Sequence, residues 1–273
     1  MFVIIFVSGN AEQANSQSSL FMDELVRTEL IEKFKKAHNK LILLDYDGTL
    51  VNYELIPQNA ILSDHLGDIL IKLIDKPHTK VLIISGRGHS DIDRLVDHLP
   101  IDIIAEHGAM KKERGVWKDQ INKEISWKKT IINVLNQFTS SCPESYIEEK
   151  KFSLTWHYRN AESKSGYLHS RELISRLENY TNSYSLKILD GNKVVEIMDQ
   201  EIGKGKAVEK LLESETYDFI LSIGDDTTDE EIFELFLPDE NAFTVKVGDG
   251  DSFAKQRFNS VSDVVLFLKH LSE

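Results

Sequence analysis

Cysteine is scarce in this 273-residue sequence, and basic residues are outnumbered by acidic ones. Cys142 is its one cysteine, so no disulfide can form within the chain, and we expect a reduced thiol in a cytoplasmic protein. The 32 lysines and arginines face 45 aspartates and glutamates, which gives a formal charge of −13. Nucleic-acid binding requires basic residues that neutralise phosphates, so no nucleic-acid partner is expected. A small phosphorylated substrate remains compatible, because it needs only a few local cations or a metal.

Long hydrophobic runs are also lacking. The apolar stretch near the N-terminus, Phe2 to Val7, has six residues and no preceding lysine or arginine. A secretory signal needs roughly 7–15 apolar residues behind a basic segment, and a membrane span needs about 20. We therefore expect residues 1–19 to be an N-terminal tail, and we expect neither a signal peptide nor a membrane partner.

Aliphatic stretches alternate with amphipathic ones in the first and last thirds of the chain. The predicted helices are at 20–38, 61–74, 90–99, 204–214, 228–236 and 260–271, and the predicted strands are at 41–47, 80–86, 101–108, 218–224 and 242–248. Continuous aliphatic strands between amphipathic helices favour an α/β fold with a parallel sheet covered on both faces. Residues 20–108 and 199–273 are expected to form this core domain.

The pattern changes between residues 109 and 198. The segments in this region are a hairpin around Gly115, a helix at 124–141, one bent strand or two strands at 145–160, a helix at 163–181, and a hairpin at 184–199 that is expected to turn at Asp190-Gly191. Hairpins with two helices indicate an α+β unit that does not continue the parallel sheet. We predict that 109–198 is an inserted domain.

Polar residues stand where the predicted core strands end. Open α/β sheets bind ligands just beyond the C-terminal ends of their strands, so these positions are candidates for a site. The residues found there are Asp45, Asp47, Gly48 and Thr49; Ser85, Gly86 and Arg87; Glu106 and His107; and Gly224, Asp225, Asp226 and Asp229. Lys204 begins the helix that leads into the last of these strands.

Several carboxylates at one sheet edge would raise one another's pKa, and a divalent cation would relieve that repulsion. Oxygen ligands without a nearby cysteine favour Mg²⁺. We expect Asp45 and Asp225 to bind the metal directly and Asp47 to bind it through its backbone carbonyl. Asp226 is a further metal candidate, in a supporting position together with Asp229.

A site that combines Mg²⁺, a serine hydroxyl and a lysine suits a phosphoryl group. Asp45 would attack phosphorus and form an aspartyl-phosphate. Asp47 would protonate the leaving oxygen and then deprotonate the hydrolytic water. Ser85 and Lys204 would hold the phosphoryl oxygens. Each stretch alone could be an ordinary strand end, turn or helix start, but their order and shared position at strand ends favour a reactive site.

Four motifs in this order, DYDGT at 45–49, ISGR at 84–87, GKGKAV at 203–208 and GDDTTDE at 224–230, resemble the haloacid dehalogenase superfamily of Mg²⁺-dependent phosphotransferases. The resemblance covers residues 41–271. It implies a Rossmann-like core, with Asp45 as nucleophile, Asp47 as acid and base, Ser85 and Lys204 at phosphate, and Asp225 on Mg²⁺. The 118 residues between Ser85 and Lys204 put the insert between the second and third motifs, as in an α/β-capped branch that often acts on sugar phosphates.

Three stretches in and around the insert, AEHGA, IEEKKFSLTWHYRNA and VVEIMDQEIGKGKAVEKLL, closely resemble the trehalose-6-phosphate phosphatase family. The resemblance implies hydrolysis of trehalose 6-phosphate, with sugar contacts from Glu148, Lys150 and Glu196. The segment before the first strand also resembles a junction to a trehalose-6-phosphate synthase, which is therefore an implied partner. Met198-Asp199 stand where relatives commonly carry Arg-Pro. The further substrate-binding candidates are Gly86, Arg87, His107, His157 and Arg159.

Two alternatives stay open. One is a phosphatase for another sugar phosphate, such as glucosylglycerol phosphate, sucrose phosphate or mannosyl-3-phosphoglycerate. The other is a regulatory domain that binds a sugar phosphate without hydrolysing it. Such a domain would be expected to lose the nucleophile or the metal-binding aspartate, whereas Asp45, Asp47, Lys204 and Asp225 are all present.

Overall fold

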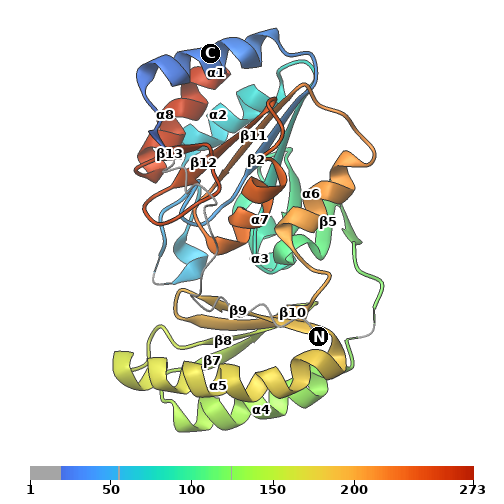
Figure 1. The fold of residues 1–273 in the computed structure, drawn as a ribbon, viewed down its shortest axis with the longest axis vertical. Helices are drawn as coiled ribbons and strands as arrows, with labels where there is room; N and C mark the ends of the chain where they lie inside the picture. Colours follow the sequence, from blue (N-terminus) through green and yellow to red (C-terminus); the bar gives the residue numbers. More distant parts are fainter. Residues whose placement is uncertain (1–19, 55, 124) are drawn as a thin grey trace, which may run out of the picture.

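A computed structural model describes residues 20–54, 56–123 and 125–273, so the tail predicted for residues 1–19 lies outside the described part. The described residues form a nine-stranded sheet and a four-stranded sheet, each with its own helices (Figure 1). We call the part with the larger sheet the core. The part from 127 to 199, which contains the smaller sheet, is called the cap.

The core sheet is mainly parallel. Only the β4–β5 and β5–β6 pairs are antiparallel. The strand order is β1 (Leu20–Phe21), β13 (Gln256–Phe258), β12 (Ala242–Val247), β11 (Phe219–Gly224), β2 (Lys40–Leu44), β3 (Thr79–Ile84), β4 (Asp102–Ala105), β5 (Met110–Glu113) and β6 (Val116–Asp119).

Helices cover both faces of the core sheet, as predicted. Alternate residues of β2 enter two different apolar clusters, because successive strand side chains point to opposite faces. Ile42 and Leu44 pack with residues of α1 (Glu24–Lys36), α2 (Asp64–Ile74), α3 (His89–Val96) and α8 (Val261–Ser272). Leu41 and Leu43 pack with residues of α6 (Lys204–Leu212) and α7 (Thr227–Leu235). The rigid, two-sided packing fixes the strand ends that carry the polar residues.

The cap is an antiparallel sheet backed by two helices. Its strand order is β7 (Tyr146–Glu149), β8 (Ser153–His157), β10 (Val194–Asp199) and β9 (Leu186–Gly191). The helices α4 (Trp127–Ser141) and α5 (Ser163–Tyr184) lie on the sheet face that points away from the core (Figure 1). Cys142 is buried among the apolar residues between this sheet and its helices.

Two features of the insert differ from the sequence-based prediction. The hairpin β5–β6 was expected in the insert, but it extends the core sheet, with Met110 paired to Ala105 of β4. The second hairpin turns at residues 192–193 and not at Asp190-Gly191, because Gly191 already pairs with Val194. Within the described residues, no helix combines the length and apolar character that a membrane span requires.

Candidate active site

A cavity of about 380 Å³ lies between the carboxyl ends of the core strands and the cap. Six of the strand-end residues predicted for the site are not part of the cavity wall: Gly48, Thr49, Glu106, Gly224, Asp225 and Asp229. The predicted residues that line it are Asp45, Asp47, Ser85, Gly86, Arg87, His107, Glu148, Lys150, His157, Arg159, Glu196, Lys204 and Asp226. The structure thus brings together residues that lie as far as 181 positions apart, Asp45 and Asp226.

Asp45 lies at the floor of the cavity, just past β2. Its side chain is buried, and its Oδ1 accepts a hydrogen bond from Lys204 Nζ at 2.7 Å. The same ammonium donates to Oδ1 of Asp229, also at 2.7 Å. Burial raises the pKa of Asp45 well above its ordinary value, and Asp229 and Asp225 raise it further against the opposing effect of Lys204. The neighbouring carboxylates therefore disfavour the charged form of Asp45, and Lys204 favours it.

Asp45, Asp225 and Asp229 can each direct one oxygen to within 4.8 Å of the others, which makes them a candidate metal group. Asp229 uses both oxygens already, since Oδ2 accepts the backbone N–H groups of Asp225 and Asp226 at 3.1 Å. Oδ1 of Asp225 is buried and has no hydrogen-bond partner among the described residues. Burial and the charge of Asp229 raise the pKa of Asp225 to about 7. An unpaired carboxylate oxygen in such a group fits a hard cation such as Mg²⁺.

Asp226 does not join this group. Its Oδ1 accepts from the backbone N–H of Thr227, and the residue caps the start of α7. The third carboxylate of the group, beside Asp45 and Asp225, is that of Asp229. The capping geometry of α7 directs the side chains of Asp226 and Asp229 differently, and the metal-binding role of Asp226 stays a prediction.

The carboxylate of Asp225 lies so close to the backbone of residue 48 that only glycine fits at this position. Its φ is +79°, and a Cβ at this position would lie 2.1 Å from Oδ2 of Asp225. That Oδ2 also accepts a hydrogen bond from the hydroxyl of Tyr53 at 2.9 Å. Sequence reasoning missed Tyr53, which lines the cavity but belongs to no recognisable motif. Together, Gly48 and Tyr53 hold the Asp225 carboxylate at one place.

Asp47 is held by Arg87 in a two-point ion pair. Nε and Nη2 of Arg87 lie 2.6 and 2.7 Å from the two oxygens of Asp47. Arg87 Nη1 contacts Asp91 at 2.5 Å, and Nη2 also donates to the carbonyl of Pro57. Arg87, which is predicted to bind substrate, lines the cavity, and its guanidinium contacts Asp47, Asp91 and the carbonyl of Pro57. Its contact with substrate stays a prediction.

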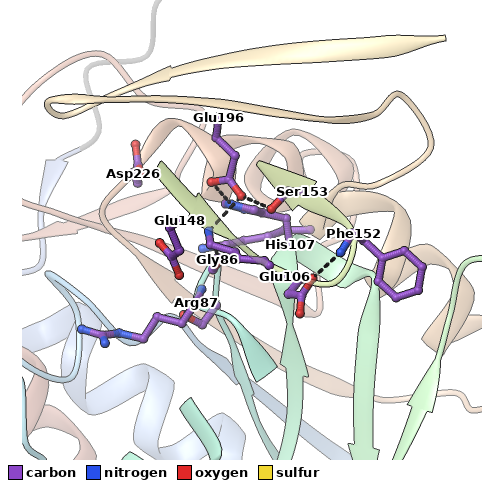
Figure 2. Close-up of polar contacts among 12 residues, drawn as sticks. Gly86, Arg87, Glu106, His107, Glu148, Phe152, Ser153, Glu196 and Asp226 are labelled. Carbon is purple, nitrogen blue, oxygen red and sulfur yellow. Dashed lines mark hydrogen bonds and ion pairs between the residues drawn. The ribbon is translucent and has the colours of Figure 1, made fainter. Parts of the chain in front are cut away.

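The cap side of the cavity carries a buried charge network. Glu196 Oε1 accepts from Lys150 Nζ at 2.8 Å and from the hydroxyl of Ser153 at 2.6 Å, and Oε2 lies 3.3 Å from Nε2 of His107 (Figure 2). Burial alone would raise the pKa of Glu196, yet Lys150 and His107 together bring it well below its ordinary value. Lys150 also donates to the carbonyl of Gly86 in the core at 2.9 Å.

The remaining predicted cap residues form the outer wall. Glu148 Oε2 lies 2.8 Å from Nε2 of His157, whose ring stacks on Tyr146 with a centroid distance of 4.5 Å. Arg159 donates to the carbonyl of Asn192 at 2.8 Å. These residues present carboxylate, imidazole and guanidinium groups above the aspartates, which suits a ligand with several hydroxyls.

Comparison with known proteins points to one family. A family model described as trehalose-phosphatase matches residues 43–262. The chain is 38% identical over 250 residues to alpha,alpha-trehalose-phosphate synthase [UDP-forming] B of Dictyostelium discoideum, which covers 89% of this chain and 32% of that protein. It is 36% identical over 272 residues to the bifunctional trehalose-6-phosphate synthase/phosphatase of Thermoproteus tenax, covering 99% of this chain and 37% of that protein. The chain therefore spans about a third of the length of these relatives.

A solved structure is also similar. The C-terminal domain of trehalose-6-phosphate phosphatase from C. albicans superposes with a TM-score of 0.86 at 27% identity, over 93% of this chain and 98% of that domain. The similarity extends over core and cap together, so the arrangement around the cavity is that of a known domain type.

Proposed function

Because the chain belongs to the trehalose-phosphatase family, we propose that it is a phosphomonoester hydrolase that converts trehalose 6-phosphate to trehalose and phosphate. The observation that carries this proposal is the position of Asp45. Its carboxylate stands beside Lys204 at the floor of a cavity whose opposite wall is the charged network around Glu196. The Lys204 side of the cavity can bind a phosphoryl group, and the charged groups around Glu196 can bind the hydroxyls of a sugar.

In the proposed reaction, an oxygen of Asp45 attacks phosphorus while the bond between phosphorus and the sugar oxygen breaks. Asp47 gives a proton to that sugar oxygen, and trehalose leaves. Asp47 then takes a proton from water, whose oxygen attacks the aspartyl-phosphate and releases phosphate with Asp45 restored. Lys204 and Ser85 hold the phosphoryl oxygens through both steps. Arg87 contacts both oxygens of Asp47, so one of these two contacts must be released before Asp47 can carry the proton.

Mg²⁺ is the proposed cofactor, held by the carboxylates of Asp45 and Asp225 and by the backbone carbonyl of Asp47. When bound, it would neutralise charge on the phosphoryl oxygens. Asp229 supports the site, because it fixes the backbone of Asp225 and shares Lys204 with Asp45. The unpaired Oδ1 of Asp225 supports this assignment.

Glu148, Lys150 and Glu196 are the proposed sugar contacts. They line the cavity from the cap and offer both donors and acceptors, as a disaccharide with many hydroxyls requires. A panel of sugar phosphates, assayed for phosphate release with Mg²⁺, tests the choice. We expect trehalose 6-phosphate to give the highest kcat/KM. Negligible turnover of it beside rapid turnover of sucrose phosphate, glucosylglycerol phosphate or mannosyl-3-phosphoglycerate would replace the substrate and keep the reaction class.

The relatives' names support a functional association with a trehalose-6-phosphate synthase, because one of them is a bifunctional synthase and phosphatase. The cytoplasmic location, inferred from the single cysteine, stays a prediction. A regulatory domain that binds sugar phosphate without hydrolysis is the alternative outcome, and it would show binding of trehalose 6-phosphate with no phosphate release.

A further inference from the structure

Glu106 is a buried carboxylate that the proposed reaction does not use. It lies in the core, in the 3-10 turn η2 (Glu106–Gly108) directly after β4, and it is 2% exposed. Its Oε2 accepts the backbone N–H of Phe152, a cap residue, at 2.8 Å (Figure 2). Its Oε1 lies 2.9 Å from Nδ1 of His89, at the start of α3. One side chain therefore joins the core to the cap.

The backbone that presents Glu106 has an unusual conformation. Glu106 and His107 have φ values of +50° and +55°, in the left-handed region that residues with a Cβ seldom adopt. Such conformations are strained and persist where the surrounding structure requires them. Here both side chains cross to the cap, since Glu106 binds Phe152 and His107 contacts Glu196. The conformation directs two neighbouring side chains at the same interface.

The cap segment that Glu106 holds also carries Lys150. Residues 150–153 form a tight turn between β7 and β8, in which the N–H of Lys150 donates to the carbonyl of Ser153 at 3.2 Å. The Phe152 ring is buried in the apolar cluster of the core, so the tip of the turn is seated on the core by its side chain and its backbone. The position of this turn sets where Lys150 Nζ meets Glu196 and the carbonyl of Gly86.

We propose that Glu106 is a positioning residue for substrate binding: it latches the 150–153 turn of the cap to the core and thereby places Lys150 in the sugar-binding half of the cavity. This inference rests on the proposed function, because it assigns to Lys150 a contact with the sugar. Through Phe152, Glu106 sets the position of a cap turn and contacts none of the groups proposed to bind the phosphoryl group. Turnover of a small phosphate ester that needs no cap contact should not depend on the latch.

The test compares Glu106→Ala, Glu106→Gln and a control, Asp119→Asn. Asp119 in β6 forms an ion pair of 2.7 Å with Lys151 of the same turn, but both side chains are exposed. The control therefore removes another contact between core and cap at the same place. Each variant is assayed with trehalose 6-phosphate and with p-nitrophenyl phosphate, and hydrogen exchange of the Phe152 amide is followed by NMR.

We expect Glu106→Ala to raise the KM for trehalose 6-phosphate roughly tenfold, the size of one lost hydrogen bond to a charged group. The rate with p-nitrophenyl phosphate should stay within about twofold, and the Phe152 amide should exchange faster. Glu106→Gln keeps an acceptor oxygen and should fall between wild type and Glu106→Ala in both measurements. Asp119→Asn should match wild type.

An unchanged KM and unchanged Phe152 exchange in Glu106→Ala would overturn the latch, as would an equal loss of activity on both substrates. If Glu106→Ala does not fold, Glu106→Gln decides, because unchanged Phe152 exchange in that variant contradicts the inference and faster exchange supports it. Failure of the proposed function is separate. Wild type would then release no phosphate from trehalose 6-phosphate, while Phe152 exchange would still report on the latch.

Discussion

The ammonium nitrogen of Lys204 lies 2.7 Å from Oδ1 of Asp45, and both side chains are buried at the floor of the cavity. Lys204 is equally close to Asp229, so one cation serves two carboxylates. Although burial alone would lower the pKa of Lys204, Asp229 and Asp45 raise it above its ordinary value. The lysine is therefore charged at neutral pH.

Replacing Lys204 should remove most of the activity. Lys204→Met keeps the length of the side chain but leaves the phosphoryl oxygens and Asp45 without a cation, and we expect kcat to fall on the order of 100- to 1,000-fold. Lys206→Met in the same helix is the control, because Lys206 is exposed and donates to the carbonyl of Gln200. The kcat of both variants is measured by steady-state phosphate release. Equal activity in the two variants would show that Lys204 has no special role.

Binding of Mg²⁺ should depend on Asp225 and not on Asp226. A ligand at a concentration of about 100 times its dissociation constant stabilises the folded state by about 2.7 kcal/mol. This corresponds to a rise in Tm of roughly 5–10 °C. We expect Mg²⁺ to give such a rise in wild type and in Asp226→Asn, since asparagine caps a helix as well as aspartate does. Asp225→Asn should show little rise in thermal unfolding. A rise in Tm with Mg²⁺ in Asp225→Asn, together with none in Asp226→Asn, would identify Asp226 as the ligand instead.

The buried network around Glu196 should make stability depend on pH. Because the folded protein holds a proton on Glu196 more weakly than the unfolded chain does, this group stabilises the fold above its ordinary pKa of 4.5. The contribution is lost as the pH falls below that value. Glu196→Gln should lower the free energy of unfolding by about 2 kcal/mol at pH 7.

The difference between wild type and Glu196→Gln should shrink by on the order of 1 kcal/mol between pH 7 and pH 3.5. Urea unfolding at several pH values measures it. The control is Glu209→Gln, which replaces an exposed glutamate of α6. A difference that stays constant or grows on acidification would contradict the assigned ion pairs.

The strand-end residues were predictable from the sequence because their convergence follows from the fold class. Once β2, β3 and β11 are parallel neighbours, Asp45, Ser85 and Asp225 must follow their ends at one edge of the sheet. The aliphatic runs and amphipathic helices that specify this fold are local signals. The contact between Arg87 and Asp47 could not be predicted in this way, because nothing in either motif shows that the Arg87 guanidinium points toward Asp47.

The two errors in the insert have physical causes. The turn at Gly115 predicts a hairpin but says nothing about which sheet the hairpin joins, because its partner strand β4 is chosen by tertiary packing. Asp190-Gly191 is a strong local turn signal. Val195 and Ile197 are buried in the cap core, and a shift of two residues keeps them on the same face. Their pattern therefore fits either turn, and the pairing of Gly191 with Val194 defines the observed one.

Asp45 is proposed to make this chain a catalyst, and the variant Asp45→Asn tests that role. Phosphate release from trehalose 6-phosphate is measured with Mg²⁺, and binding of the same compound is measured by calorimetry. We expect Asp45→Asn to lose roughly 1,000-fold or more in turnover while its affinity stays within a few fold of wild type. Undiminished phosphate release by Asp45→Asn, or binding without release by the wild-type chain, would contradict it.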